Sequence, residues 1–358
     1  MRNIRRLPQI ARALLCLIIL EMNLAMGLPA RAASPTVSPS EEVVVPPLEY
    51  AIRSRDVTFG NPTYNLKATL TLPREAKGKV PAVIIIGGSG PVDRDGTVGE
   101  NGQNKPYKDL AEGLTRAGFA VLRYDKRVVN YHYEVDEYMR TTLKDEYFED
   151  VQWALQWIRQ QPQVDPYRIF LLGHSLGGVI AMIMAQWFPL IKGVIMMATP
   201  GRYMDELQIY QYRLFAKRVG ASDAQLDDME ARYHRVYYLL RHDQFPKDIP
   251  FDNLFQAYWY DILNRNPDKI IRQVRQPMLI LQGDRDYQVT LDDVVIFKHA
   301  LAEIGNHQAT VRVFGRLNHI FMPYEGNLLA EQYDIPGHVP DEVLQTIASW
   351  IRTHLEMR

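Results

Sequence analysis

Cysteine is almost absent from this sequence of 358 residues. Its one cysteine, Cys16, lies in an N-terminal apolar run that we expect to be removed. A mature chain without cysteine has no disulfide, no thiol nucleophile and no cysteine-ligated zinc. Its stability therefore depends on a hydrophobic core, and a hydrophobic content of 47% is sufficient to build one.

An excess of charge of either sign is also missing. The 41 Lys and Arg residues are balanced by 42 Asp and Glu residues, which leaves a formal net charge of -1. Without a basic excess to displace counterions from phosphates, no electrostatic argument supports nucleic-acid binding. No His-x-x-x-His motif or carboxylate–histidine cluster stands out either, so we predict that the protein uses no metal and no other cofactor.

A long membrane-spanning run is missing as well. Residues 13–20 are mostly apolar, but this run is too short for a bilayer span of about 20 residues. Arginines precede the run, and Ala30-Arg31-Ala32 resembles a signal-peptidase site. We predict that residues 1–32 are a cleaved signal peptide and that the protein is periplasmic or secreted, with no stable membrane span after cleavage. An uncleaved N-terminal anchor is the alternative.

The rest of the sequence indicates an α/β domain with one insertion. Residues 33–47 are rich in Ser, Pro and Glu and are expected to form a flexible leader. Buried strands then alternate with helices over residues 48–200 and again over residues 267–358, as in a mostly parallel central sheet flanked by helices. Residues 201–266 contain helical segments and no good buried strand. We predict that they form a helical lid inserted after the sixth strand.

The strongest motif is Gly173-His174-Ser175-Leu176-Gly177, between an expected strand at residues 168–172 and an apolar helix. A strand that turns abruptly into a helix exposes a serine hydroxyl and needs glycine beside it. Ser175 is therefore the candidate nucleophile, and the Leu176 N–H at the helix start is a candidate oxyanion donor. The alternative is a structural turn with a capping serine. His174 shares this tight turn, so we interpret it as a packing residue.

The run DPYRIFLLGHSLGG, residues 165–178, resembles the nucleophile region of bacterial α/β-hydrolases, in which the acid and the histidine follow the serine in the chain. The resemblance implies that Asp286 is the acid, since it stands three residues after the glycine that follows the expected strand at residues 277–281. Asp284 is the rival. It also implies that His319, in the loop after the last strand, is the base. Among the other histidines, His338 is the next candidate, and His299 and His307 are expected at the surface.

A second oxyanion donor is expected in the loop after the strand at residues 80–86. This loop reads GGSGPVDRDG and is similar to that of a subgroup of bacterial esterases and peptidase-like hydrolases. By analogy the Ser89 N–H is the donor, with Gly90 as the alternative, and Gly88, Gly90 and Arg94 are expected to border the substrate. Arg94 is either a salt-bridge hub or a contact for a substrate carboxylate.

A further segment, Asp125-Lys126-Arg127, resembles another motif of this subgroup. Two valines follow it, where the subgroup usually has a glycine, so the segment has no assigned role.

Together these features predict a carboxylesterase that acts on small to medium esters through a Ser-His-Asp triad and an acyl-enzyme. An aminopeptidase or a thioesterase would use the same residues, because the leaving-group preference lies in the pocket. A non-catalytic binding protein of this fold would lack a triad member, and none is missing. The many tyrosines of the expected lid either line an acyl pocket or pack the lid onto the body.

Overall fold

The computed structural model describes residues 50–306, 309–327 and 329–356. The predicted signal peptide and leader, together with Cys16, lie outside these residues. The described residues belong to one compact unit.

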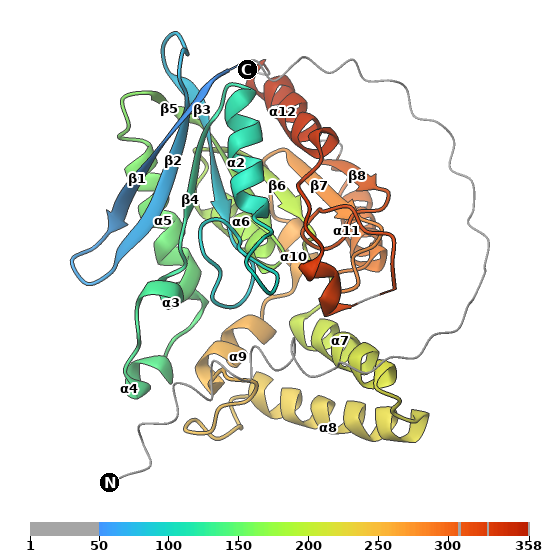
Figure 1. Cartoon of the computed structure of the whole chain (residues 1–358). Helices are drawn as coiled ribbons and strands as arrows, with labels where there is room; N and C mark the ends of the chain where they lie inside the picture. Colours follow the sequence, from blue (N-terminus) through green and yellow to red (C-terminus); the bar gives the residue numbers. More distant parts are fainter. Residues whose placement is uncertain (1–49, 307–308, 328, 357–358) are drawn as a thin grey trace. The chain divides into compact units, whose positions relative to one another are not determined.

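The structure is built on a sheet of eight strands in the order β1-β2-β4-β3-β5-β6-β7-β8 (Figure 1). The strands are β1 (Ile52–Gly60), β2 (Asn65–Pro73), β3 (Val80–Ile86), β4 (Ala120–Tyr124), β5 (Val164–His174), β6 (Ile191–Met197), β7 (Met278–Gly283) and β8 (Ala309–Phe314). Strand β2 is antiparallel to both of its neighbours, and every other pair of adjacent strands is parallel. The predicted mostly parallel α/β sheet is confirmed.

Helices connect most of the parallel strands. They are α2 (Pro106–Arg116), α3 (Arg127–Asn130), α4 (Val135–Tyr138), the π-helix η2 (Lys144–Phe148), α5 (Glu149–Ile158), α6 (Leu176–Trp187), α7 (Met204–Arg218), α8 (Asp223–Arg241), α9 (Gln256–Leu263), α10 (Pro267–Ile271), α11 (Leu291–Glu303), the 3-10 helix η3 (Ala330–Asp334) and α12 (Asp341–Glu356). The three- and four-residue spacing of apolar residues over 145–160 predicts one ordinary helix, but this segment begins with the π-helix η2. Throughout the described ranges, every helix is too short or too polar to cross a bilayer.

The continuous apolar runs of the central strands are explained by burial on both faces of the sheet. In β3, Ala82, Ile84 and Ile86 point into a core that contains residues of α5 and α6. Val83 and Ile85 point the other way, into a core that contains residues of α2 and α12. Successive residues of β3 therefore point into two different hydrophobic cores. Both faces of the strand are buried, so its sequence is apolar throughout.

The helices α7, α8 and α9 follow β6, precede β7 and lie together at one end of the sheet (Figure 1). Aromatic side chains pack against each other inside this segment. The rings of Tyr212 and Tyr233 are stacked with centroids 4.6 Å apart, and Tyr237 meets Trp259 edge to face at 5.6 Å. Tyr237 and Trp259 are buried. Tyr237 and Trp259 also belong to the hydrophobic core that contains residues of α5 and α6. These aromatic residues therefore pack the segment together and onto the body, as the second of the two alternatives expects.

The start of this segment is anchored to the body by a buried carboxylate. The N–H groups of Gly201 and Arg202 both donate to Asp293 Oδ1, at 3.0 and 3.1 Å, and Arg202 Nη2 donates to Asp293 Oδ2 at 2.6 Å. Asp293 lies in the first turn of α11 and is fully buried. The helical segment therefore leaves the sheet at a defined point.

Candidate active site

The predicted site residues lie at one edge of the sheet. Ser89, Ser175, Asp286 and His319 follow the strands β3, β5, β7 and β8, which are parallel in the sheet. The carboxyl ends of parallel strands meet at the same edge, which is where open α/β sheets bind their ligands.

Ser175 occupies a strained turn between β5 and α6. Its φ of 54° and ψ of -126° are uncommon for a residue with a side chain. The turn is held by a hydrogen bond from the Ser175 N–H to Met197 O, at 2.8 Å, at the end of β6. A Cβ atom at Gly177 would lie 2.3 Å from Ile86 O, and one at Gly173 would lie 2.1 Å from Gly177 O. Any side chain at either position would collide with backbone atoms, so both glycines are needed for the tight turn.

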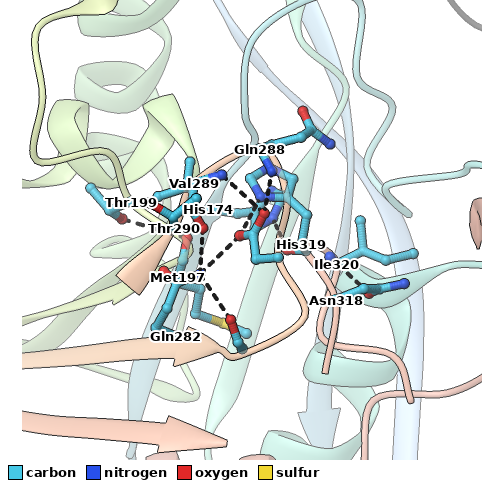
Figure 2. A network of polar contacts seen from close by, with 12 residues as sticks. His174, Met197, Thr199, Gln282, Gln288, Val289, Thr290, Asn318, His319 and Ile320 are labelled. Atoms are coloured by element: carbon cyan, nitrogen blue, oxygen red, sulfur yellow. Dashed lines mark hydrogen bonds and ion pairs between the residues drawn. The ribbon is translucent and has the colours of Figure 1, made fainter. Parts of the chain in front are cut away.

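His319 and Asp286 form a buried pair in which Nδ1 lies 2.8 Å from Oδ2. The carboxylate of Asp286 also accepts the N–H groups of Gln288 and Val289, at 2.8 and 3.0 Å, and Gln282 Nε2 at 2.9 Å. Figure 2 shows His319, Gln282, Gln288 and Val289 within this network. The carboxylate is held in one orientation and accepts the hydrogen on Nδ1, so Nε2 is the nitrogen left to take a proton.

The rival carboxylate has a different role. Asp284 Oδ1 accepts the N–H of Arg316 at 2.6 Å, which ties the turn after β7 to the turn after β8. The two aspartates are two residues apart in the chain, but of the two only Asp286 is hydrogen-bonded to His319.

The remaining candidate histidines lie outside this arrangement. His338 is exposed and contacts Asp109, with 3.1 Å between Nδ1 and Oδ2. His299 is exposed on α11, and His307 is outside the described residues. Within the described ranges, no group of three or more metal-ligating side chains is arranged to hold an ion.

The loop of His319 is linked to the serine turn through His174, the residue before Ser175. In the described part of the chain, no hydrogen bond joins the Ser175 hydroxyl to the His319 ring. His174, which precedes the serine, has its ring 4.7 Å from the His319 ring, and its Nε2 lies 2.8 Å from His319 O (Figure 2). Catalytic hydrogen bonds are often long without substrate and shorten when it binds.

His174 is a buried neutral histidine with a hydrogen bond on each ring nitrogen. Because the His319 carbonyl only accepts, Nε2 of His174 carries the hydrogen, and Nδ1 accepts from the Tyr107 hydroxyl at 2.9 Å. Burial is the main reason, and the neighbouring His319 a further one, that the pKa of His174 falls to about 3. Both nitrogens are occupied, so His174 joins the turn of the serine to the loop of His319. The sequence motif contained this residue but did not indicate its partners.

The glycine-rich loop after β3 packs directly against the serine turn. A Cβ atom at Gly88 would lie 3.2 Å from Ser175 Cβ. The Gly88 N–H donates to the Tyr107 hydroxyl at 3.2 Å, and its carbonyl is also bonded within the protein. Its polar atoms are therefore not free to bind substrate. No hydrogen bond within the described residues uses the N–H of Ser89 or of Leu176.

Of the two roles considered for Arg94, the structure shows the salt-bridge hub. Its Nε and Nη2 atoms donate to the two oxygens of Asp125 at 2.9 and 3.0 Å, and Nη1 donates to Ala68 O at 2.9 Å. The substrate contact expected of Arg94 is therefore corrected: its guanidinium faces Asp125 and β2. Gly90, by contrast, has a φ of 78° and accepts the N–H of Val92, which shapes the loop.

Comparisons with known proteins show which family the chain resembles. The family model described as serine aminopeptidase, S33, matches residues 99–325. Esterase EstD of Thermotoga maritima is 32% identical over 307 residues, which cover 84% of this chain and 68% of that protein.

Solved structures share the fold at lower identity. An esterase from Pyrococcus furiosus aligns with a TM-score of 0.54 and 16% identity, covering 92% of this chain and 99% of that one. Est1E from Butyrivibrio proteoclasticus aligns with a TM-score of 0.52 and 17% identity, covering 84% and 98%.

The buried neutral His174 predicts a loss of stability in mild acid. The pKa of a histidine in the unfolded chain is about 6.5, whereas the pKa of His174 in the folded protein is about 3. Below about pH 6.5 the unfolded state therefore binds a proton that the folded state excludes. His174 should therefore contribute a fall in the free energy of unfolding with decreasing pH, of up to about 1.4 kcal/mol per pH unit. Urea unfolding of the wild type between about pH 7.5 and pH 5 measures this slope.

The His174→Gln variant should show a shallower slope over the same range, whatever its stability at neutral pH. The exposed His299 on α11 provides the matched control, and His299→Gln should keep the wild-type slope. An unchanged slope in His174→Gln would contradict the burial of a neutral ring at this position.

Proposed function

The chain belongs to the α/β-hydrolase family described as serine aminopeptidase, S33, and from this premise we propose that it is a carboxylesterase for small to medium esters. It is a serine hydrolase that acts on esters, like the esterase relative. The observation that carries the more specific proposal is the buried Asp286–His319 pair beside a strained serine turn.

In the proposed mechanism Ser175 Oγ attacks the ester carbonyl carbon while His319 Nε2 takes its proton. The negative charge that develops on the carbonyl oxygen is stabilised by the N–H groups of Ser89 and Leu176. His319 then gives the proton to the leaving alcohol, which departs and leaves an acyl group on Ser175. Water attacks this acyl-enzyme with the same base, and the carboxylic acid is released.

Asp286 supports each proton transfer by holding His319. Its hydrogen bond to Nδ1 keeps Nε2 unprotonated in the resting enzyme and stabilises the imidazolium that forms during attack. Three further donors fix this carboxylate, so it cannot turn away from the ring when the charge on His319 changes.

The triad proposal predicts that a fluorophosphonate probe labels the wild type at Ser175 and does not label Ser175→Ala. Asp286→Asn should lower kcat by about 10⁴-fold, because the amide favours the wrong tautomer of His319. Steady-state hydrolysis of p-nitrophenyl butyrate measures this effect.

Asp284→Asn is the matched control, since it makes the same chemical change two residues away, at a carboxylate that bonds to the Arg316 N–H and not to His319. It should retain turnover close to that of the wild type. Equal losses in the two variants, or labelling that persists in Ser175→Ala, would count against the triad.

We also propose that the helical segment is a lid that sets acyl-chain preference. Its first helix, α7, reaches the loop that carries Asp286: Gln211 Nε2 donates to Gln288 O at 3.0 Å, and the Phe215 ring meets the Tyr287 ring edge to face at 5.8 Å. A shift of α7 would therefore displace Tyr287 and Gln288, which are next to Asp286 in the chain.

A substrate panel distinguishes an esterase from an aminopeptidase or thioesterase with the same residues. We expect p-nitrophenyl esters to be cleaved with higher kcat/KM than aminoacyl-p-nitroanilides or acyl thioesters. Within the ester series, kcat/KM should pass through a maximum at short or medium chains. Faster cleavage of the anilides would favour the aminopeptidase, and faster cleavage of the thioesters would favour the thioesterase.

Export to the periplasm or the medium is a further part of the proposal, supported by the basic, apolar and small-residue segments of residues 1–32. Expression of the full chain in a Gram-negative host should yield a mature protein that begins at Ala33. Mass spectrometry of the fractionated cells measures the N-terminus, and an intact chain in the membrane fraction would favour the uncleaved anchor.

A further inference from the structure

The carbonyl oxygen of Gly88 is held by two buried side chains from other parts of the chain. Lys126 Nζ donates to it at 3.0 Å and the Tyr147 hydroxyl donates at 2.6 Å. Lys126 follows β4, and Tyr147 lies in the π-helix η2. Both are almost completely inaccessible to solvent, so this carbonyl is fixed from inside the protein.

The hydrogen-bonding capacity of this cluster is fully used. Lys126 Nζ contacts Gly88 O, the Tyr147 hydroxyl at 2.6 Å and Glu146 Oε1 at 2.6 Å, which accounts for all three hydrogens of the ammonium. The Tyr147 hydroxyl accepts one of them and gives its own hydrogen to Gly88. No donor is left for a substrate, so any effect on the reaction must pass through Gly88.

Gly88 O and the N–H of Ser89 belong to the same peptide group. A trans peptide is planar and directs its C=O and N–H in opposite directions, and the described chain contains no cis peptide. The carbonyl faces the buried Lys126 and Tyr147, so the N–H of Ser89 faces the opposite way, and Ser89 is exposed. The same glycine lies against Ser175.

We propose that Lys126 and Tyr147 are positioning residues of the oxyanion hole, which fix and polarise the Gly88–Ser89 peptide so that its N–H donates to the oxyanion. This inference rests on the proposed function, in which the Ser89 N–H is one of the two donors. A cation on the carbonyl oxygen draws electron density along the peptide and strengthens its N–H as a donor, most strongly where water is excluded.

The neighbouring residue of the same segment supports the loop at a second point. Asp125 accepts both the backbone N–H of Arg94, at 2.8 Å, and its guanidinium. Asp125 and Lys126 therefore hold the two ends of the loop that contains Ser89. The Asp125-Lys126-Arg127 segment, which has no role in the sequence analysis, thus acquires one.

An oxyanion donor acts on the transition state more than on the bound substrate, so its misplacement lowers kcat and leaves KM nearly unchanged. Loss of a whole donor costs about 10²–10³-fold in kcat. Tyr147→Phe keeps the ring and removes one of two supports, so we expect a fall of about 10-fold. Lys126→Met removes the charge as well, and we expect a larger fall of about 10²-fold.

The test compares Tyr147→Phe and Lys126→Met with Tyr131→Phe. The Tyr131 hydroxyl also donates to a backbone carbonyl, that of Asn65, at 2.8 Å, but lies outside the site. Active sites are first counted by complete reaction with a fluorophosphonate. Then kcat and KM for p-nitrophenyl butyrate, and the Ki of a trifluoromethyl ketone that forms an oxyanion on the serine, are measured per active site.

The positioning role predicts that Ki rises by the same factor as kcat/KM falls in Tyr147→Phe, with KM unchanged and with Tyr131→Phe like the wild type. A purely structural role would reduce the number of active sites or the melting temperature but leave kcat and Ki per site unaltered, which would overturn the inference. Should Lys126→Met fail to fold, Tyr147→Phe decides alone. An unlabelled wild type would instead overturn the proposed function itself.

Discussion

The close approach of the loop after β3 to the serine turn is the constraint on which the rest of the site depends. A methyl group at Gly177 would lie 2.3 Å from Ile86 O, and one at Gly88 would lie 3.2 Å from Ser175 Cβ. Two backbone segments can lie this close only where glycine stands on one side of each contact. The approach brings the loop that carries Ser89 beside the start of α6, where Leu176 lies.

A chain of hydrogen bonds maintains this approach and extends it to the base. The Gly88 N–H donates to Tyr107, Tyr107 donates to His174, and His174 donates to the carbonyl of His319. The loops after β3, β5 and β8 are thereby joined by groups that are all buried. The low pKa of His174 keeps this chain intact at neutral pH, because a protonated ring would have no acceptor for Tyr107.

The helical segment is a different kind of element from the sheet that carries it. Its aromatic residues pack with each other, and its buried residues continue the hydrophobic core that contains residues of α5 and α6. It meets the site through α7 and the loop of Asp286. The reaction type follows from the strand-end loops, whereas substrate preference is expected to follow from this segment. The fold by itself does not separate ester from amide or thioester cleavage.

The sequence by itself determined the fold and the loops that carry Ser175, Asp286 and His319, because buried strands are readable as apolar runs and the family motif follows them. The tertiary structure alone decided which aspartate meets His319, that Arg94 is bound by Asp125, and that Lys126 and Tyr147 hold Gly88. These pairings join residues from 31 to 59 positions apart. Periodicity describes which face of an element is buried, not which donor meets which acceptor. The π-helix η2 was not predicted, because the apolar spacing of residues 145–160 fits an ordinary helix and the backbone hydrogen bonds that define a π-helix have no signature in that spacing.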